Sequence, residues 1–269
     1  MNIKFLLASL LLVASLFSCS KDDINFENNK NGQLKLKFDH IVGGKSLVLN
    51  DYTYSNNSNE QFNVELLKYY VSNIKLTNEE GEEYALPKKE SYFLIDAADK
   101  ASLFPKFNIP EGKYTKLEFV LGVDSITNTL PVEERTGALD ISKHGMYWSW
   151  NSGYIFFKME GTSPASTSTD KKFRYHIGLF GGYDKPTKNN IKTIKIDLTK
   201  AGAAEVKENL SSDIHLMVDL GKVFDADNKI SIAQNSTVMV AGPNDLIAAN
   251  YAKMFTHDHT HNFQKLSNE

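Results

Sequence analysis

The chain has 269 residues, a net charge of −3 and a sequence pI near 6.2, so it has no excess of positive charge that would attract nucleic acid or an anionic membrane. Its lysines and arginines are spread along the sequence without the clustering that a phosphate-binding face needs. We therefore expect no nucleic-acid partner, and the roughly 250 residues that follow a leader are enough to bury one sizeable core.

The first 19 residues have the pattern of a bacterial lipoprotein signal peptide. A short basic start, Met1 to Lys4, precedes an apolar run from Phe5 to Phe17, which at about 13 residues is too short to span a bilayer of about 30 Å. The small residue Ser18 then precedes Cys19, the only cysteine of the chain. The pattern predicts lipidation of Cys19, which leaves no thiol for a disulfide, for thiol catalysis or for a cysteine metal site.

Residues 20–32 are expected to form a flexible tether. Its start, Ser20-Lys21-Asp22-Asp23, is similar to the short lysine and acidic signal that sends lipoproteins of Bacteroidota to the outer face of the outer membrane. The alternative is a polar tether without address information. We expect an outer-membrane lipoprotein anchored through Cys19, with the cell surface favoured over the periplasmic face.

From Gln33 onward the hydrophobic pattern is that of half-buried strands, with Leu34, Leu36 and Phe38 alternating with polar residues. Further β-rich runs follow, many of them bounded by turn residues such as Pro110-Glu111-Gly112. These runs are Tyr69 to Leu76, Tyr92 to Ile95, Tyr114 to Leu121, Tyr154 to Met159, Phe173 to Leu179, Ile191 to Leu198 and Ile214 to Leu220. Strands in series without interleaved helices predict one all-β domain over residues 33–263, an antiparallel β-sandwich of the immunoglobulin-like or jelly-roll-like kind, followed by a tail at 264–269.

The densest aromatic segment runs from Gly145 to Tyr154 and contains both tryptophans of the protein. As a strand, it would place Met146, Trp148 and Trp150 on one face. An aromatic stripe of this kind is typical of a sandwich core or of a ligand platform, and an exposed one can stack on a sugar ring.

Two further segments depart from the strand pattern. The polar, low-complexity stretch Gly161 to Lys171 predicts a mobile loop between two strands. Asn244-Asp245 is expected to cap one short C-terminal helix, in which Ile247, Tyr251 and Met254 recur at helical spacing. Such a helix would serve as a lid or plug on the sandwich.

Conventional catalytic motifs are missing from the sequence. It contains no Gly-x-Ser-x-Gly elbow, phosphate loop, His-Glu-x-x-His helix or dinucleotide fingerprint. We therefore expect a binding protein and not an enzyme.

The histidines are the candidate metal ligands, because without a free thiol a transition metal must be held by imidazole, carboxylate or thioether groups. The segment His257-Asp258-His259-Thr260-His261, if extended, points alternate residues to one side and can offer two imidazoles to one copper or zinc ion, with Asp258 beside them. The alternative is a solvated tail near the C-terminus.

The other histidines are weaker candidates when each is taken alone. His40 and His176 lie next to strand patterns, where a hydrogen-bonded structural histidine is the usual finding. His215 alternates with apolar residues within a strand and, with His257, ranks second as a ligand. His144 lies in a Lys-His-Gly turn and is expected to be exposed.

Several of these segments occur in an order that covers nearly all of the mature chain, and Gly145 to Tyr154 with its two tryptophans is the most specific of them. The others are Phe38 to Gly44, Leu67 to Leu76, Gly122 to Ser125, Lys158 to Gly161, Tyr175 to Gly178, Asn250 to Phe255 and Asp258 to Asn262. Together they resemble the MbnP-like family, extracytoplasmic proteins named for a copper-binding member that is associated with methanobactin. Leu179 departs from the family pattern, in which a second glycine often follows His-Ile-Gly.

The resemblance implies an all-β domain that binds copper. The ligands it favours are His40, His176, His259 and His261. In some members a dihaem peroxidase-type partner oxidises a tryptophan to kynurenine, which helps to form the copper site, and the resemblance makes Trp148 and Trp150 the candidates here.

The sequence thus predicts a lipid-anchored extracytoplasmic protein that captures or stores copper, as Cu(I) or Cu(II), with zinc as the other candidate metal. Met146 or Met254 would supply a thioether for Cu(I). The alternative is a surface adhesion or glycan-binding module that contacts its ligand through Tyr147 to Tyr154, and a purely structural subunit of a surface complex stays as background. Convergence of the four favoured histidines and burial of the tryptophans would separate these hypotheses.

Overall fold

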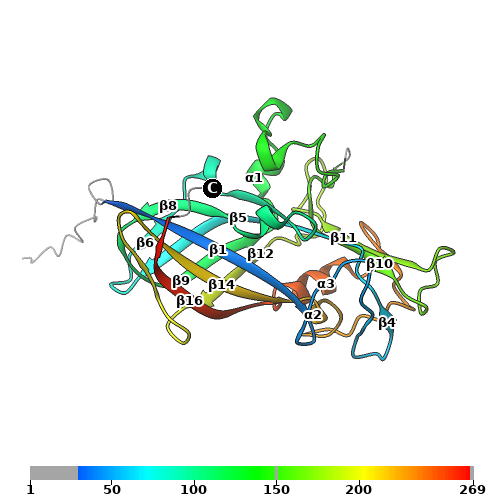
Figure 1. Ribbon diagram of the computed structural model, residues 1–269. Helices are drawn as coiled ribbons and strands as arrows, with labels where there is room; N and C mark the ends of the chain where they lie inside the picture. The colour runs from blue at the N-terminus through cyan, green and yellow to red at the C-terminus, as the bar shows by residue number, and fades with distance from the viewer. Residues whose placement is uncertain (1–29, 149–150, 267–269) are drawn as a thin grey trace, which may run out of the picture.

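The alternation of apolar and polar residues after Gln33 forms a long strand, β1 (Asn31–Val42), in which every second side chain is buried. The structure is a computed structural model that describes residues 30–148 and 151–266. β1 lies inside a sheet ordered β16-β14-β1-β2, and β8 also pairs with β1 (Figure 1). The other strands of this first sheet are β2 (Lys45–Ser46), β8 (Lys106–Pro110), β14 (Leu210–Asp219) and β16 (Phe255–Lys265).

The second sheet is ordered β12-β9-β5-β10-β11-β15, with β13 pairing with β9 and both β6 and β7 pairing with β5. Its strands are β5 (Leu66–Asn78), β6 (Glu83–Ala85), β7 (Tyr92–Asp96), β9 (Gly112–Leu121), β10 (Ile155–Thr162), β11 (Lys172–Gly178), β12 (Lys192–Asp197), β13 (Ala204–Val206) and β15 (Thr237–Val238). The short strands β3 (Tyr54–Ser55) and β4 (Gln61–Phe62) pair with each other.

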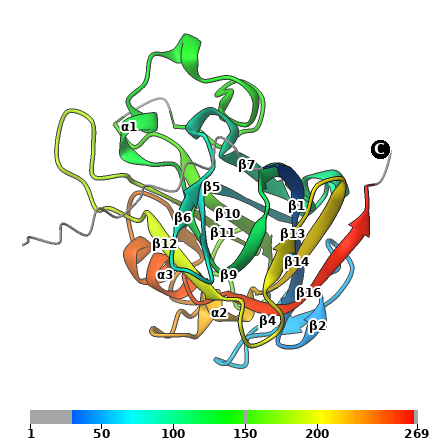
Figure 2. The same ribbon diagram turned by 90° about the vertical axis from the view of Figure 1, so that its left-hand side faces the viewer.

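The two sheets curl around a shared apolar core (Figure 2). Phe38 of β1 packs edge-on against Tyr69, Phe119 and Phe255, with ring centroids 6.1, 6.3 and 6.3 Å away. Each such ring stabilises the fold by about 1.5–3 kcal/mol through its burial, and edge-on contacts between rings add to this. A second apolar cluster, which includes Trp148 and Tyr154, involves the long excursion of residues 122–154 between β9 and β10.

The predicted all-β, sandwich-like fold with a small helical part is confirmed. The pairing is not purely antiparallel, however, because β1 pairs parallel with β14 and β11 pairs parallel with β15. A parallel pair needs a long crossover connection, and most of the chain lies between β1 and β14. Local hydrophobic patterns do not reveal pairing of this kind, because it joins segments that are far apart in the sequence.

The predicted late helix is α3 (Asn244–Tyr251), which begins after Pro243 and ends before Met254. Asn244 does not cap it: its side-chain amide donates to the carbonyl oxygens of Met239 (3.1 Å) and Val240 (2.8 Å) in the preceding turn. The other helical elements among the described residues are α1 (Ser125–Asn128), α2 (Gly221–Phe224) and the 3-10 turns η2 (Lys88–Glu90), η3 (Lys100–Leu103), η4 (Val132–Glu134) and η5 (Gly137–Leu139).

The polar stretch after Gly161 forms the predicted loop between β10 and β11. Hydrogen bonds from its hydroxyl and backbone groups attach it to the rest of the domain. Ser163 Oγ donates to the Gln61 carbonyl oxygen (2.6 Å), and the backbone N–H of Thr167 donates to Ser236 Oγ (2.9 Å). The polar residues of the loop therefore hold it in place through hydrogen bonds that involve side chains, without strand pairing.

The predicted leader, Cys19 and the tether up to residue 29 lie outside the described residues, as do Trp150 and residues 267–269. Within residues 30–148 and 151–266, no helix has the length and apolar character needed to cross a membrane.

Candidate metal centre

Three histidines meet on the outer face of the first sheet, where β14 and β16 pair antiparallel. In this register His215 lies opposite His259, and Asp213 lies opposite His261. His215 faces away from the core because its neighbours in β14, Ile214 and Leu216, are fully buried on the other face. The segment near the C-terminus is therefore a paired strand, and His215, His259 and His261 form what we call the histidine triad.

The triad has the dimensions of a metal site. Each residue offers one ring nitrogen, and these three atoms lie within 4.8 Å of one another. Nε2 of His259 is 3.0 Å from Nε2 of His261. Two nitrogens bound at about 2.0–2.1 Å to one tetrahedral ion would be about 3.3 Å apart, so a small shift of the rings would accommodate copper or zinc.

A β-bulge decides which histidines of β16 take part. The pairing skips Asp258, so that His257 lies opposite the buried Leu216 while His259 lies opposite His215. His257 is thereby turned away from the triad, and its Nε2 lies 2.9 Å from Thr260 Oγ1. Strict alternation would have placed His257 and His259 on the same face, and the extra residue breaks that alternation.

The electrostatic setting keeps His215 neutral. Burial, the neighbouring rings of His259 and His261, and the ammonium of Lys37 lower the pKa of His215 to about 4. A neutral imidazole is the form that binds a metal, because the proton and the metal compete for the same lone pair. His215 is therefore ready to act as a ligand at neutral pH.

Asp258 fixes the orientation of His259. Its Oδ2 lies 2.9 Å from Nδ1 of His259. An ionised carboxylate can only accept hydrogen bonds, so Nδ1 carries the proton and the lone pair is left on Nε2, the atom that faces His261. The bulge residue thus has a second role beside its effect on strand register.

His40 lies in the first sheet on the opposite face from the triad. It is one of the alternate, buried residues of β1, and its Nε2 is 2.9 Å from the hydroxyl of Tyr69 in the core. Burial lowers the pKa of His40 to about 4.

His176 lies in the other sheet, in β11, where Nε2 is 2.7 Å from Oε1 of Glu160. The four histidines that the resemblance favours therefore do not share one site: His259 and His261 come together with the second-ranked His215, and not with His40 or His176. A strand pattern places His215 on an outer face, but only the register of β14 against β16 brings it to its partners.

The described parts of the tryptophan segment, 145–148 and 151–154, pair with each other as the two arms of a hairpin, so they are not one long strand. Tyr147 bridges to Tyr154, the N–H of Trp148 donates to the Gly153 carbonyl oxygen (3.0 Å), and the N–H of Ile155 donates to the Met146 carbonyl oxygen (2.9 Å). The side chain of Trp148 is 7% exposed. Its ring therefore does not form an open platform for a ligand.

Gly178 makes room for the indole of Trp148. A Cβ atom at position 178 would lie 2.8 Å from Cζ3 of that ring. Gly178 is two residues from His176 in β11 and so lies on the same outer face. Trp148 therefore packs on β11 two residues along the strand from His176, whose ring contacts Glu160 of β10.

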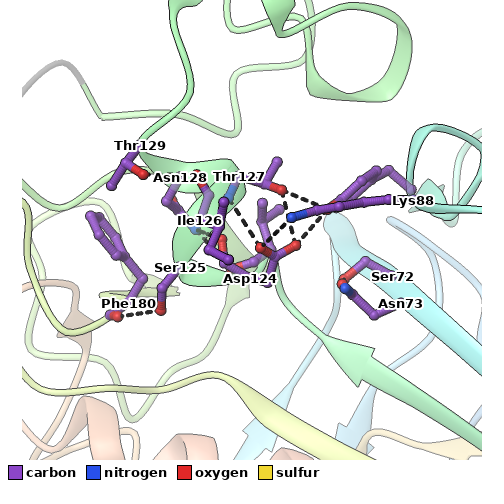
Figure 3. Close-up of polar contacts among 12 residues, drawn as sticks. Ser72, Asn73, Lys88, Asp124, Ser125, Ile126, Thr127, Asn128, Thr129 and Phe180 are labelled. Atoms are coloured by element: carbon purple, nitrogen blue, oxygen red, sulfur yellow. Dashed lines mark hydrogen bonds and ion pairs between the residues drawn. The ribbon is translucent and has the colours of Figure 1, made fainter.

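The excursion that carries this hairpin is anchored by Asp124 (Figure 3). Its Oδ1 accepts hydrogen bonds from the Thr127 N–H (3.0 Å) and from Lys88 Nζ (3.1 Å), and Ser125 Oγ donates to the Phe180 carbonyl oxygen (3.0 Å). The contacts of the carboxylate lower the pKa of Asp124 despite its partial burial. The family-like segment Gly122 to Ser125 therefore has a structural role in placing the hairpin.

The two proposed thioether ligands are not at the triad. Met146 is buried in the cluster that contains Trp148, and Met254 is buried in the main core. Each side chain is about 1% exposed.

Comparison with known proteins relates this chain to one family. The family model described as MbnP matches residues 31–240, which include His215 but end before His259 and His261. Among solved structures, MbnP from Methylosinus trichosporium is similar with a TM-score of 0.52 and 18% sequence identity, over 76% of this chain and 82% of that chain. At this identity the likeness concerns the fold. No curated protein sequence matches the chain.

Proposed function

Because this chain belongs to the MbnP family, we propose that it is a lipid-anchored extracytoplasmic protein that binds copper for capture or storage. The observation that carries the proposal is the histidine triad, in which three ring nitrogens lie within 4.8 Å of one another. Two of its members lie outside the region matched by the family model, so the triad supports copper binding independently of that match.

The chemistry of the triad fits copper. Imidazole is a ligand for both copper and zinc, and divalent copper binds a given nitrogen site more tightly than the other divalent metals of its row. His261 is exposed, so the site opens to the solvent. An open site is suited to loading and release, whereas a structural zinc site is closed by four protein ligands.

A titration with copper tests the proposal directly. We expect the mature protein to bind Cu(I) and Cu(II) in competition with chelators, and the double variant His259→Ala, His261→Ala to lose this binding. His144→Ala is the matched control, because His144 lies between β9 and β10, away from the triad, with its Nε2 3.2 Å from the Gly137 carbonyl oxygen. Equal copper affinity of the double variant and the unchanged protein would overturn the proposal.

The roles of His40 and His176 as further ligands stay predictions. Each ring already has a hydrogen-bond partner, Tyr69 for His40 and Glu160 for His176. The single variants His40→Gln and His176→Gln test them through the number of copper ions bound per chain. A lower stoichiometry in either variant would indicate a second copper site.

We also propose that a dihaem peroxidase-type partner oxidises Trp148 or Trp150. The packing of Trp148 against Gly178, on the same face of β11 as the paired His176 and Glu160, supports a functional role for this part of the second sheet. Peptide mass mapping after co-expression with such an enzyme tests the proposal. A product in which both tryptophans remain unmodified would contradict it.

The proposed location rests on Cys19. We expect the unchanged protein to fractionate with the outer membrane and to be cleaved when intact cells are treated with protease. Cys19→Ser should release the protein from the membrane. Protease resistance in intact cells together with cleavage in permeabilised cells would place it on the periplasmic face.

The glycan-binding alternative has little support from the hairpin, because Trp148 is packed against β11 and is 7% exposed. A binding role without catalysis remains our proposal for the whole chain. A glycan array without hits would remove the alternative.

A further inference from the structure

The histidine triad is part of a regular grid on the outer face of the first sheet. Because β1, β14 and β16 are in register, side chains lie next to one another in rows across the strands. One row is Lys37, His215 and His259, and the next is Lys35, Asp213 and His261. The triad therefore occupies three corners of a square whose fourth corner is Asp213.

The carboxylate of Asp213 lies beside the triad but is not one of its three clustered ligand groups. It does not belong to the group of ligand atoms that lie within 4.8 Å of one another. It forms an ion pair with Lys35, and its Oδ1 accepts a hydrogen bond from Ser211 Oγ at 2.7 Å. Asp213 is only 7% exposed, so its charge depends on these partners for compensation.

We propose that Asp213 is the fourth ligand of the metal centre. In the metal-free protein its carboxylate pairs with the ammonium of Lys35, which a divalent ion displaces when it binds. This inference rests on the proposed metal-binding function and adds the fourth ligand and the preferred charge of the ion. Lys35 has a long side chain that is partly exposed, so its ammonium can move into solvent when a divalent ion takes its place.

The chemistry of the fourth ligand determines which metal ions bind more tightly. A carboxylate is a hard ligand that suits divalent ions, whereas Cu(I) is satisfied by imidazole nitrogens and soft sulfur. The Asp213 carboxylate should therefore strengthen the binding of Zn(II) and Cu(II) and contribute little to Cu(I). Divalent ions must displace Lys35 from Asp213, while Cu(I) can bind to the triad with that ion pair intact.

The variant Asp213→Asn tests the fourth ligand. We expect Zn(II) affinity, measured by competition with a chelator, to fall by about 10- to 100-fold, which is the range for partners that tune a metal site. The electron paramagnetic resonance spectrum of bound Cu(II) should change as well, and Cu(I) affinity should be unchanged. A thermal melt of the metal-free variant checks that it folds.

Asp39 provides the matched control. It lies on the same face of the sheet, in the row after His215, and it also pairs with a lysine, Lys37, at 2.8 Å. Asp39→Asn therefore removes an equivalent charge without touching the fourth corner. Equal losses of Zn(II) affinity in Asp39→Asn and Asp213→Asn would show a general charge effect and overturn the assignment of Asp213.

Lys35→Met tests the competing cation. We expect it to raise Zn(II) affinity, and we expect this gain to vanish when Asp213→Asn is also present, because Lys35 acts only through that carboxylate. A gain that persists in the double variant would overturn the competition. Loss of all metal binding in His259→Ala, His261→Ala tests the proposed function separately, so normal Zn(II) binding by Asp213→Asn would refute only the fourth ligand.

Discussion

Asp258 shows how one residue can act on both the backbone and the chemistry of a site. It is the extra residue of the bulge in β16, and its carboxylate holds Nδ1 of the adjacent His259. The sequence placed Asp258 near the histidines, but which ring it contacts follows from the bulge. A carboxylate behind a metal-binding histidine fixes the ring orientation and makes the ring a stronger ligand.

We therefore predict that Asp258→Asn lowers copper affinity by about tenfold or more while the three ligands stay in place. The asparagine amide cannot serve as an anionic acceptor for Nδ1 of His259. Chelator competition measures the loss, and Asp227→Asn, which alters an exposed carboxylate near Lys253 away from the site, is the control. An unchanged affinity would mean that strand pairing alone orients the ring.

The burial of His40 predicts how the stability of the fold depends on pH. Burial lowers its pKa in the folded protein to about 4 from a reference value of 6.5. Between these two values the unfolded chain binds a proton that the folded chain does not, so stability is complete above pH 6.5 and falls as the pH decreases towards 4. The shift corresponds to about 3 kcal/mol in total.

Urea denaturation of the metal-free protein at a series of pH values measures this effect. We expect His40→Gln, which keeps a polar partner for Tyr69, to show a smaller loss of stability over the same pH range. His144→Gln is the control: it removes a half-buried histidine from a turn outside the core and leaves the buried His40 in place, so the dependence due to His40 should be retained. An equal pH dependence in both variants would show that the His40 ring is not buried as described.

At the scale of elements, the hairpin of residues 146–155 depends on its contact with β11. A Cβ atom built at Gly178 would lie 2.8 Å from the indole of Trp148 and 2.5 Å from the Tyr154 carbonyl oxygen. Both are tighter than ordinary van der Waals contact. The backbone oxygen cannot move without shifting the hairpin.

We predict that Gly178→Ala destabilises the protein by about 1–3 kcal/mol, the usual cost of overpacking. It should also change the near-ultraviolet circular dichroism of the tryptophans. Gly112→Ala is the control, because a Cβ atom there meets Tyr114 at 3.7 Å, an ordinary contact. Denaturant unfolding of both variants measures their free energies of unfolding. An unchanged free energy of unfolding in Gly178→Ala would contradict the packing of Trp148.

At the scale of the whole molecule, the triad joins the last strand to the body of the domain. His215 belongs to β14, whereas His259 and His261 belong to β16, so a bound metal would link the two strands. A ligand that binds only the folded state stabilises it in proportion to the logarithm of its free concentration. If the triad binds a metal as proposed, metal binding and the stability of β16 are coupled.

We predict that free metal at 100 times its dissociation constant stabilises the protein by about 2.7 kcal/mol. Thermal melts with and without metal measure the gain, and a chelator should reverse it. Hydrogen exchange should slow most in β16. The variant His259→Ala, His261→Ala should show neither response, and stabilisation that persists in it would place the metal elsewhere.

Much of the fold could be predicted from the sequence because strand formation follows local alternation. The runs at Tyr69, Tyr114 and Ile214 became β5, β9 and β14, and the helix at Asn244 became α3. The sequence also puts His259 and His261 on one face, because residues two apart in an extended segment point to the same side. These properties depend on neighbours only a few residues apart.

Which histidines form the triad depends on the tertiary structure alone. His215 joins the triad because β14 pairs with β16 in one register, and His257 leaves it because a bulge shifts that register. His40 faces the core and His176 belongs to the other sheet. Pairing between distant strands sets these positions, and the energies that select it come from packing across the whole core, which no local pattern in the sequence contains.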